Sequence, residues 1–93
     1  MTTELRNNSQ QLRFEYWVDG VLLGITDYSI RTDGAVMIPH TEIDPAHGGQ
    51  GHGTTMVRSV LDVLRSEGMN VVPACPFVAA FIDNHPDYAD MVT

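Results

Sequence analysis

The residues best suited to chemistry are a single cysteine and a histidine–glutamate pair. Cys75 directly precedes Pro76, which favours the first turn of a helix, and a helix N-terminus lowers the pKa of a thiol. His40 and Glu42 lie two residues apart, so both would project from one face of a strand, where either could act as a general base. We therefore take Cys75, His40 and Glu42 as candidate catalytic residues. An inert buried cysteine and a solvent-facing pair are the alternatives.

A glycine-rich segment is the second chemical feature. Four of the six residues from 48 to 53 (GGQGHG) are glycine, and they stand between a predicted strand and a predicted helix. Glycines let the backbone approach a ligand, while the free N–H groups and the dipole at a helix start attract an anion. The segment therefore predicts a pyrophosphate site, with a mobile ligand-free loop as the alternative. A dinucleotide fingerprint would need a third glycine where Met56 stands.

Composition narrows the possible functions. The 93 residues carry twelve acidic and five basic side chains, a net charge of -7, and every basic residue is arginine. The lack of lysine excludes Schiff-base chemistry and a P-loop lysine, and the acidity argues against nucleic-acid binding. One cysteine and four histidines without paired spacing predict no metal site. No apolar run reaches the ~20 residues of a membrane span, and the N-terminus lacks a signal-peptide core, so we expect no membrane partner and a cytoplasmic location.

The elements that would position these residues follow from the hydrophobic pattern. Residues 1–10 are polar and are predicted to be a loose tail, and residues 11–93 a single domain. Alternating apolar residues predict a strand over 12–18, and Asp19-Gly20 predicts a hairpin into a second strand over 21–30. A further turn at Asp33-Gly34 leads to a third strand over 35–43. These segments predict a three-stranded antiparallel meander.

The second half of the chain is predicted to be mainly helical. Apolar residues at helical spacing predict a crossover helix over 54–67, and Gly68 suits its C-terminal end. The apolar stripe of this helix consists of Met56, Val57, Val60, Leu61 and Leu64. A short strand over 70–74 contains Pro73, which predicts a splayed or edge strand, and a C-terminal helix follows over 77–84. The fold class is therefore α+β.

Several segments resemble the GNAT superfamily of N-acetyltransferases. The pyrophosphate signature of that superfamily, Arg/Gln-x-x-Gly-x-Gly/Ala, aligns on Gly51 and Gly53, with Gly48 in the first position in place of Arg or Gln. The chain is similar in particular to the short YjdJ-type N-acetyltransferase-like domains, over roughly residues 12 to 92. The segments that carry this similarity are HTEI (40–43), GQGHG (49–53), VPACPFV (72–78) and HPDYAD (85–90).

The resemblance implies a truncated GNAT-like fold that binds acetyl-CoA. The pantetheine arm would lie along the backbone of Glu42 and Ile43, and Cys75 would line the acetyl pocket. The pyrophosphate would bind to Gly49, Gln50, Gly51, His52, Gly53 and Thr54, with His52 contributing mainly its backbone N–H. Thr55 stands where relatives often carry a lysine, which leaves Arg58 as the nearest cation. Phe81 stands where relatives often carry a tyrosine that protonates the leaving thiolate.

Together these features predict an acetyl-CoA-dependent N-acetyltransferase that acts on an amine of a small molecule or a protein. The alternative is a non-catalytic acyl-CoA-binding module with an interaction or sensing role, because Phe81 cannot replace the tyrosine acid. Tyr88 is expected to anchor the C-terminal segment, with a role as the missing acid as the alternative. An open sheet face carrying Trp17 would suit a homodimer.

Overall fold

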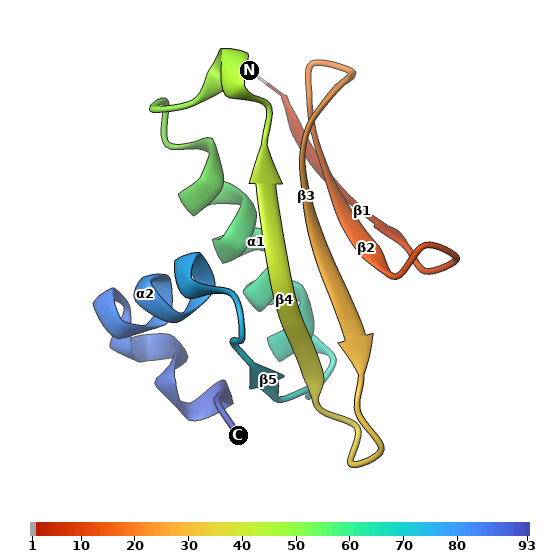
Figure 1. The fold of residues 1–93 in the computed structure, drawn as a ribbon, viewed down its shortest axis with the longest axis vertical. Helices are drawn as coiled ribbons and strands as arrows, with labels where there is room; N and C mark the ends of the chain where they lie inside the picture. The colour runs from red at the N-terminus through yellow and green to blue at the C-terminus, as the bar shows by residue number, and fades with distance from the viewer. Residues whose placement is uncertain (1) are drawn as a thin grey trace.

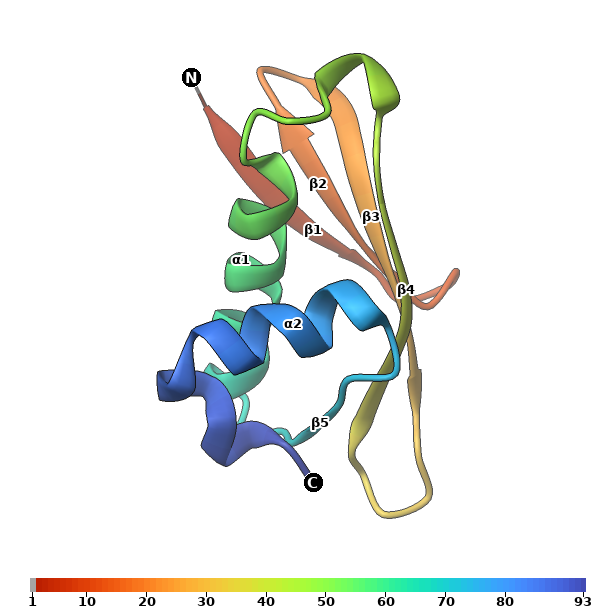
Figure 2. The same ribbon diagram turned by 60° about the vertical axis from the view of Figure 1, so that its left-hand side comes forward.

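The computed structural model describes residues 2–93 as a five-stranded sheet with two α-helices packed against one of its faces (Figures 1 and 2). The sheet order is β1-β2-β3-β4-β5, antiparallel except for the parallel pair β4–β5. The strands are β1 (Thr3–Asn8), β2 (Arg13–Val18), β3 (Val21–Ile30), β4 (Val36–Ile43) and β5 (Val71–Val72). The helices are α1 (His52–Ser66) and α2 (Pro76–Asn84), with 3-10 turns over Pro45–His47 and Pro86–Met91. The predicted α+β class is confirmed.

The prediction of a loose tail over residues 1–10 is wrong for the residues that the structure describes. Thr3–Asn8 form edge strand β1, which pairs along its whole length with β2. Leu5 packs against the core, while the side chains of Glu4 and Arg6 stay exposed and form an ion pair. A charged edge strand of this kind discourages pairing with other chains. The antiparallel meander therefore has four strands instead of three.

The two predicted Asp-Gly hairpins are confirmed. Asp19 and Gly20 both have positive φ values, which matches the two-residue turn that joins β2 to β3. Asp33 and Gly34 lie in the turn between β3 and β4, where the amide of Arg31 donates to the carbonyl of Ala35. The turn sets the pairing of β4 at Val36 and Met37, and a register shift between Asp27 and Ser29 of β3 then precedes the segment of β4 that carries His40, Thr41 and Glu42.

Helix α1 packs on the sheet through the apolar stripe expected from the sequence. All five residues of the stripe are at most 2% exposed. They belong to two hydrophobic clusters, one shared with β4, β5 and α2, and the other with β2 and β3. The members of the stripe are Met56, Val57, Val60, Leu61 and Leu64. This packing fixes the N-terminus of α1, and with it the glycine loop, at one end of the sheet (Figure 1).

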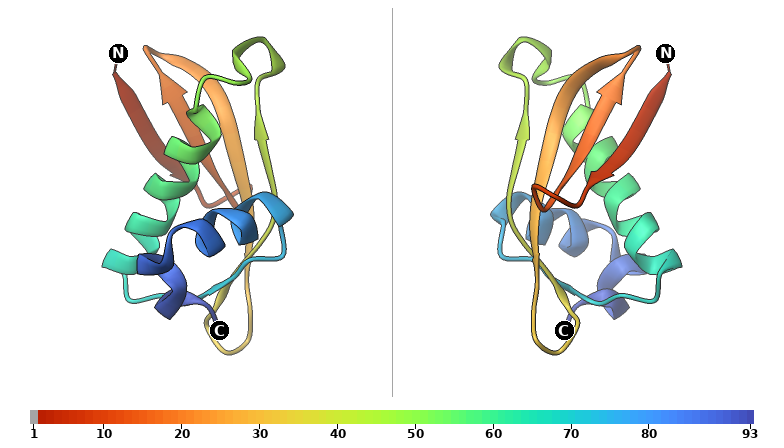
Figure 3. Two further views of the ribbon diagram at one scale, coloured as in Figure 1. Left: turned by 90° about the vertical axis from the view of Figure 1, so that its left-hand side faces the viewer. Right: turned by 90° about the vertical axis from the view of Figure 1, so that its right-hand side faces the viewer.

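Strand β5 is shorter than the predicted 70–74 because Pro73 has no N–H for the sheet. Val71 and Val72 of β5 pair with Val36 and Met37 of β4. After Pro73 one further hydrogen bond joins the chain to β4, from the amide of Cys75 to the carbonyl of Ile38 at 2.8 Å. Beyond that bond, β4 continues to Ile43 while the chain after β5 turns into α2 (Figure 3). The predicted splay of this strand is confirmed, and it leaves a gap in the sheet between β4 and the start of α2.

The C-terminal segment is held down by Tyr88, as expected for an anchor. Its ring is buried and its hydroxyl donates to the Asp62 carboxylate on α1 at 2.6 Å. Within residues 2–93, neither helix is long and apolar enough to cross a membrane. The same residues contain no group of three or more His, Cys, Asp or Glu side chains placed to hold a metal ion.

Candidate functional site

The glycine loop forms a cradle at the N-terminus of α1. Gly49 and Gly51 have φ values of 76° and 82°, a region open to glycine, and Gly51 is the N-cap of the helix. A cavity of about 320 Å³ lies against the loop and the first turn of α1. It is lined by Ile43, His47, Gly48, Gly49, Gly51, His52, Gly53, Thr54 and Phe77. Because the first amides of a helix have no partner within it, this cavity is suited to an anion.

The side chain of His52 holds the cradle to the sheet. The ring is buried, and its Nδ1 is hydrogen-bonded to the Tyr16 hydroxyl on β2 at 3.1 Å. Burial raises the pKa of Tyr16. The sequence predicted mainly a backbone role for His52 and gave no sign of this contact. Gln50 lies outside the cradle and lines a neighbouring hollow with Val18 and Asp19.

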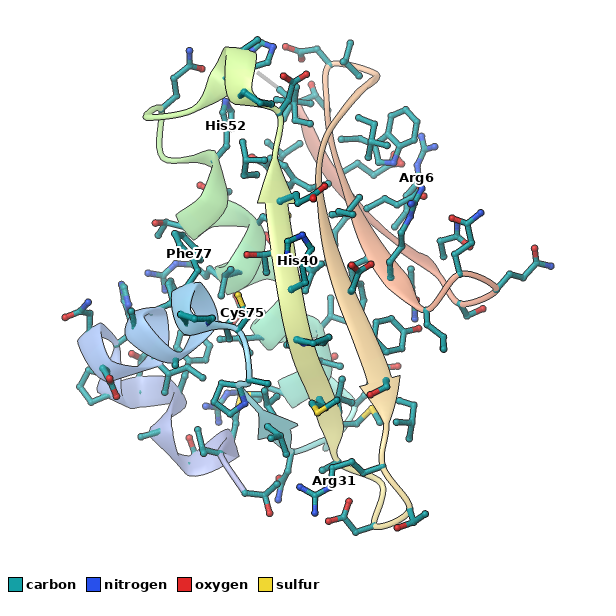
Figure 4. The ribbon with its side chains drawn as sticks, viewed as in Figure 1. Arg6, Arg31, His40, His52, Cys75 and Phe77 are labelled. Atoms are coloured by element: carbon teal, nitrogen blue, oxygen red, sulfur yellow. The ribbon has the colours of Figure 1, made fainter. Side chains whose placement is uncertain are left out.

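Cys75 is the N-cap residue of helix α2 (Figure 4). Its side chain is buried, and its Sγ lies 3.5 Å from the Thr41 Oγ1 of β4. Burial raises the pKa of this thiol, but hydrogen bonds from the Thr41 side chain and from the amides of Val78 and Phe77 outweigh burial and hold the pKa below its ordinary value. These contacts favour the thiolate form of Cys75 more than burial alone would.

A second cavity, of about 350 Å³, lies beside Cys75 in the gap between β4 and α2. Its lining residues are Thr41, Glu42, Ile43, Gly53, Met56, Cys75, Pro76 and Phe77. Three residues, Ile43, Gly53 and Phe77, line both this cavity and the cavity of the glycine loop. The cavity of the glycine loop and the cavity beside the thiol are thus neighbours, and together they reach from the start of α1 to the start of α2.

The His40–Glu42 pair lies on the opposite face of β4 from the Cys75 thiol. The pair alternates along the strand with Thr41, whose side chain contacts Cys75. His40 Nε2 and Glu42 Oε1 are 2.9 Å apart, and both side chains are more than half exposed. The hydrogen bond to Glu42 raises the pKa of His40. The structure therefore places the three predicted catalytic residues around one strand, with the side chains of the pair exposed on the face away from the thiol, although Glu42 also lines the cavity beside Cys75.

Arg58 does not line the cavity of the glycine loop, and its role as the nearest cation to the cofactor stays a prediction. Its guanidinium lies over the Phe81 ring, 5.5 Å from the centroid, and its Nη1 is 3.5 Å from the Tyr88 hydroxyl, to which it donates. Phe81 is buried and stacks on His85. Arg58 is thus part of the contact between α1 and the C-terminal segment.

Comparison with known families decides the identity of this architecture. The family model described as GCN5-related N-acetyl-transferase matches residues 13–91. The chain belongs to the GCN5-related N-acetyltransferase family. The matched range includes the glycine loop, Cys75 and the His40–Glu42 pair on β4. The assignment to the YjdJ-type branch within this family stays a prediction. A search of curated proteins finds no match.

Solved structures of the GCN5-related family share the fold. A GCN5-like protein from Staphylococcus aureus is 20% identical with a TM-score of 0.72, over 97% of this chain and 87% of the other. The ribosomal-protein-S18-alanine N-acetyltransferase of Escherichia coli is 20% identical with a TM-score of 0.63, and the match covers 85% of this chain but 54% of the enzyme. AAC(6')-Iy, solved with the bisubstrate analogue CoA-S-monomethyl-acetylneamine, is 17% identical with a TM-score of 0.52, over 82% and 58% of the two chains.

Two residues of this GCN5-related domain gain importance only from the structure. Thr41 contacts the thiol from β4, although it lies 34 residues before Cys75 in the sequence. Phe77 is 46% exposed, although it begins a helix whose other large apolar residues, Val78, Phe81 and Ile82, are buried. An aromatic residue outside the apolar stripe of a helix was the signal in the sequence that could have identified Phe77.

Proposed function

We propose that this protein is an acetyl-CoA-dependent N-acetyltransferase that acts on a primary amine. The observation that carries the proposal is that the cavity of the glycine loop adjoins the cavity beside the buried Cys75 thiol, with three lining residues in common. A donor with a pyrophosphate at one end and a thioester at the other has the chemistry that these two ends require. Membership of the GCN5-related family and a structural neighbour solved with a CoA-containing analogue support the same donor.

The residues of the cradle fit the anionic part of CoA. The amides at Gly49, Gly51, Gly53 and Thr54 would hold the pyrophosphate with the help of the α1 dipole. The backbone of Glu42 and Ile43, next to the gap between β4 and α2, would hold the pantetheine arm. His52 would contribute through its backbone N–H, because its side chain is committed to Tyr16. Gln50 does not line the cavity, so it would contribute only through the backbone of the loop.

Cys75 would take part in the transfer in one of two ways. In the covalent route, the Cys75 thiolate attacks the thioester carbonyl, a new C–S bond forms, and the C–S bond to CoA breaks to release CoA as a thiol after protonation. The amine then attacks the acetyl-cysteine, forms the amide, loses a proton and regenerates the thiolate. In the direct route, the amine attacks the donor carbonyl and Cys75 is a wall of the acetyl pocket.

The proton that the amine loses would pass to the His40–Glu42 pair. The pair lies on the open face of β4, opposite the helices, so an amine that arrives from that face would meet it first. His40 would accept the proton in its neutral form, and Glu42 would hold the ring and stabilise the resulting charge. A positioned general base contributes about 10²- to 10⁴-fold in rate.

A second candidate function, a non-catalytic acyl-CoA-binding module, is favoured by two observations. Phe81 has no hydroxyl to protonate a leaving thiolate and is buried in the core. The thiol and the His40–Glu42 pair also lie on opposite faces of β4. Such a module would bind acyl-CoA without turnover.

One set of measurements separates these possibilities. The intact mass of the protein is recorded after incubation with acetyl-CoA, beside the Cys75→Ala variant, and CoA binding and thiol release across an amine panel are measured in parallel. A Cys75-dependent acetyl adduct supports the covalent route, and amine-dependent thiol release without an adduct supports the direct route. Binding with neither result supports the non-catalytic module and refutes the enzyme. No binding of CoA refutes both candidate functions.

A further inference from the structure

The Phe77 ring stands at the junction between the cradle and the Cys75 cavity. It lines both cavities, together with Ile43 and Gly53. Phe77 is on the first turn of α2, directly after Pro76, while the cradle belongs to α1 (Figure 4). The side chain thus bridges the N-termini of the two helices, and nearly half of it remains open to solvent.

Gly53 provides the room for this ring. A Cβ atom at Gly53 would lie 3.0 Å from Cζ of Phe77 and 3.5 and 3.6 Å from two further ring atoms. Gly49 and Gly51 differ, because their positive φ values require glycine while a Cβ there would meet nothing within 4 Å. The glycine at position 53 is therefore explained by its contact with Phe77, whereas the other two are explained by the conformation of the loop.

We propose that Phe77 positions the pantetheine arm of the acyl donor by packing it against Ile43, between the cradle and the thiol. This inference rests on the proposed function, because it takes the donor to be acyl-CoA. A ligand held in the cradle and reacting at Cys75 must cross the residues common to both cavities, which are Ile43, Gly53 and Phe77. Two of these are apolar side chains, and they suit the carbon chain of pantetheine rather than a phosphate.

The arm would cover the exposed part of the Phe77 ring. Burial of a phenylalanine side chain stabilises by a few kcal/mol, and about half of this ring is still exposed, so its contribution corresponds to roughly three- to tenfold in affinity. The contribution would fall on the pantetheine part of the donor alone. The affinity for a ligand that keeps the nucleotide end but lacks the pantetheine arm would not depend on the Phe77 ring.

The test compares CoA with adenosine 3′,5′-bisphosphate, which lacks the pantetheine arm, by calorimetry on the full chain. We expect Phe77→Ala to weaken CoA binding about three- to tenfold and to change bisphosphate binding less than twofold. Val63→Ala is the matched control, because Val63 is also an exposed apolar helix residue, 37% exposed, and it lines neither cavity. It should change neither affinity, and thermal unfolding should show that both variants are folded.

The Gly53→Ala variant provides a second, independent test. We expect it to weaken CoA binding in the parent protein, by shifting the ring slightly, and to have little further effect when Phe77 is alanine, because the tight contact is then gone. Equal losses for both ligands in Phe77→Ala, no loss for either, or an undiminished effect of Gly53→Ala in the double variant would each overturn the inference. If the parent protein binds no CoA, the proposed function itself fails, and this inference falls with it.

Discussion

Replacement of Thr41 by valine tests whether the environment of Cys75 activates the thiol. The Thr41 Oγ1 lies 3.5 Å from the sulfur, and its hydrogen bond is one of the contacts that lower the pKa of Cys75 against the effect of burial. A hydrogen bond to a charged group contributes about 1.5 kcal/mol at the lower end of its range, roughly tenfold in an equilibrium. Thr41→Val keeps the shape of the side chain and removes this bond, so the thiolate fraction should fall about tenfold.

The rate of thiol alkylation should fall less than the thiolate fraction. A thiolate of higher pKa is a better nucleophile, with a Brønsted coefficient of about 0.4–0.5, and this recovers about threefold. We therefore expect iodoacetamide to react with Cys75 about three- to fourfold more slowly in Thr41→Val, at a pH where the rate still rises with pH. The matched control is Thr26→Val, because Thr26 pairs directly with Thr41 in the register of β3 and β4. An unchanged rate in Thr41→Val, or an equal fall in Thr26→Val, would refute this account of the thiol.

Two further predictions concern the base and the core. Glu42→Gln removes the contact that raises the pKa of His40, so the pKa of His40 should fall. Because a general base must be unprotonated to act, the acidic limb of the pH–rate profile for acetyl transfer should then move to lower pH. An unmoved limb would contradict a role for His40 as the base. Thr26→Val should raise the free energy of unfolding by about 1 kcal/mol, measured by urea denaturation, because the Thr26 hydroxyl is buried without a hydrogen-bond partner among residues 2–93. A destabilised variant would show that this hydroxyl is satisfied in solution.

Local patterns were sufficient to predict most of the fold. The apolar spacing of α1 identifies every residue of its buried stripe, because one helix face supplies most of its packing. The Asp-Gly pairs identify both hairpins, since few other residues adopt the positive φ values of such turns. Pro73 predicts the splay, because a missing N–H interrupts the sheet wherever the strand lies. In each case the cause acts within a few residues of the chain.

Features that depend on distant partners were not predictable in this way. Strand β1 has only Leu5 as an apolar residue that packs inward, and its conformation comes from the ladder with β2 rather than from its own pattern. The hydrogen bond between Tyr16 and His52 joins residues 36 apart in sequence. The contact between Thr41 and Cys75 likewise depends on the crossover that brings β4 beside the start of α2. The candidate site is built largely from contacts of this second kind.

The positions of the arginines bear on how the glycine loop would bind the pyrophosphate of the proposed donor. Each of the five arginines contacts a partner away from the cradle, and within residues 2–93 none of them lines it. These contacts are Arg6 with Glu4, Arg13 with Glu15, Arg31 with Asp33, Arg58 with Tyr88, and Arg65 with Asp90. In the proposed pyrophosphate site, the anionic charge would therefore be met by amide N–H groups and the α1 dipole, which act only at short range. The proposed site would therefore depend on the loop conformation that Gly49 and Gly51 allow, and in this way a chain without lysine is compatible with a multiply charged donor.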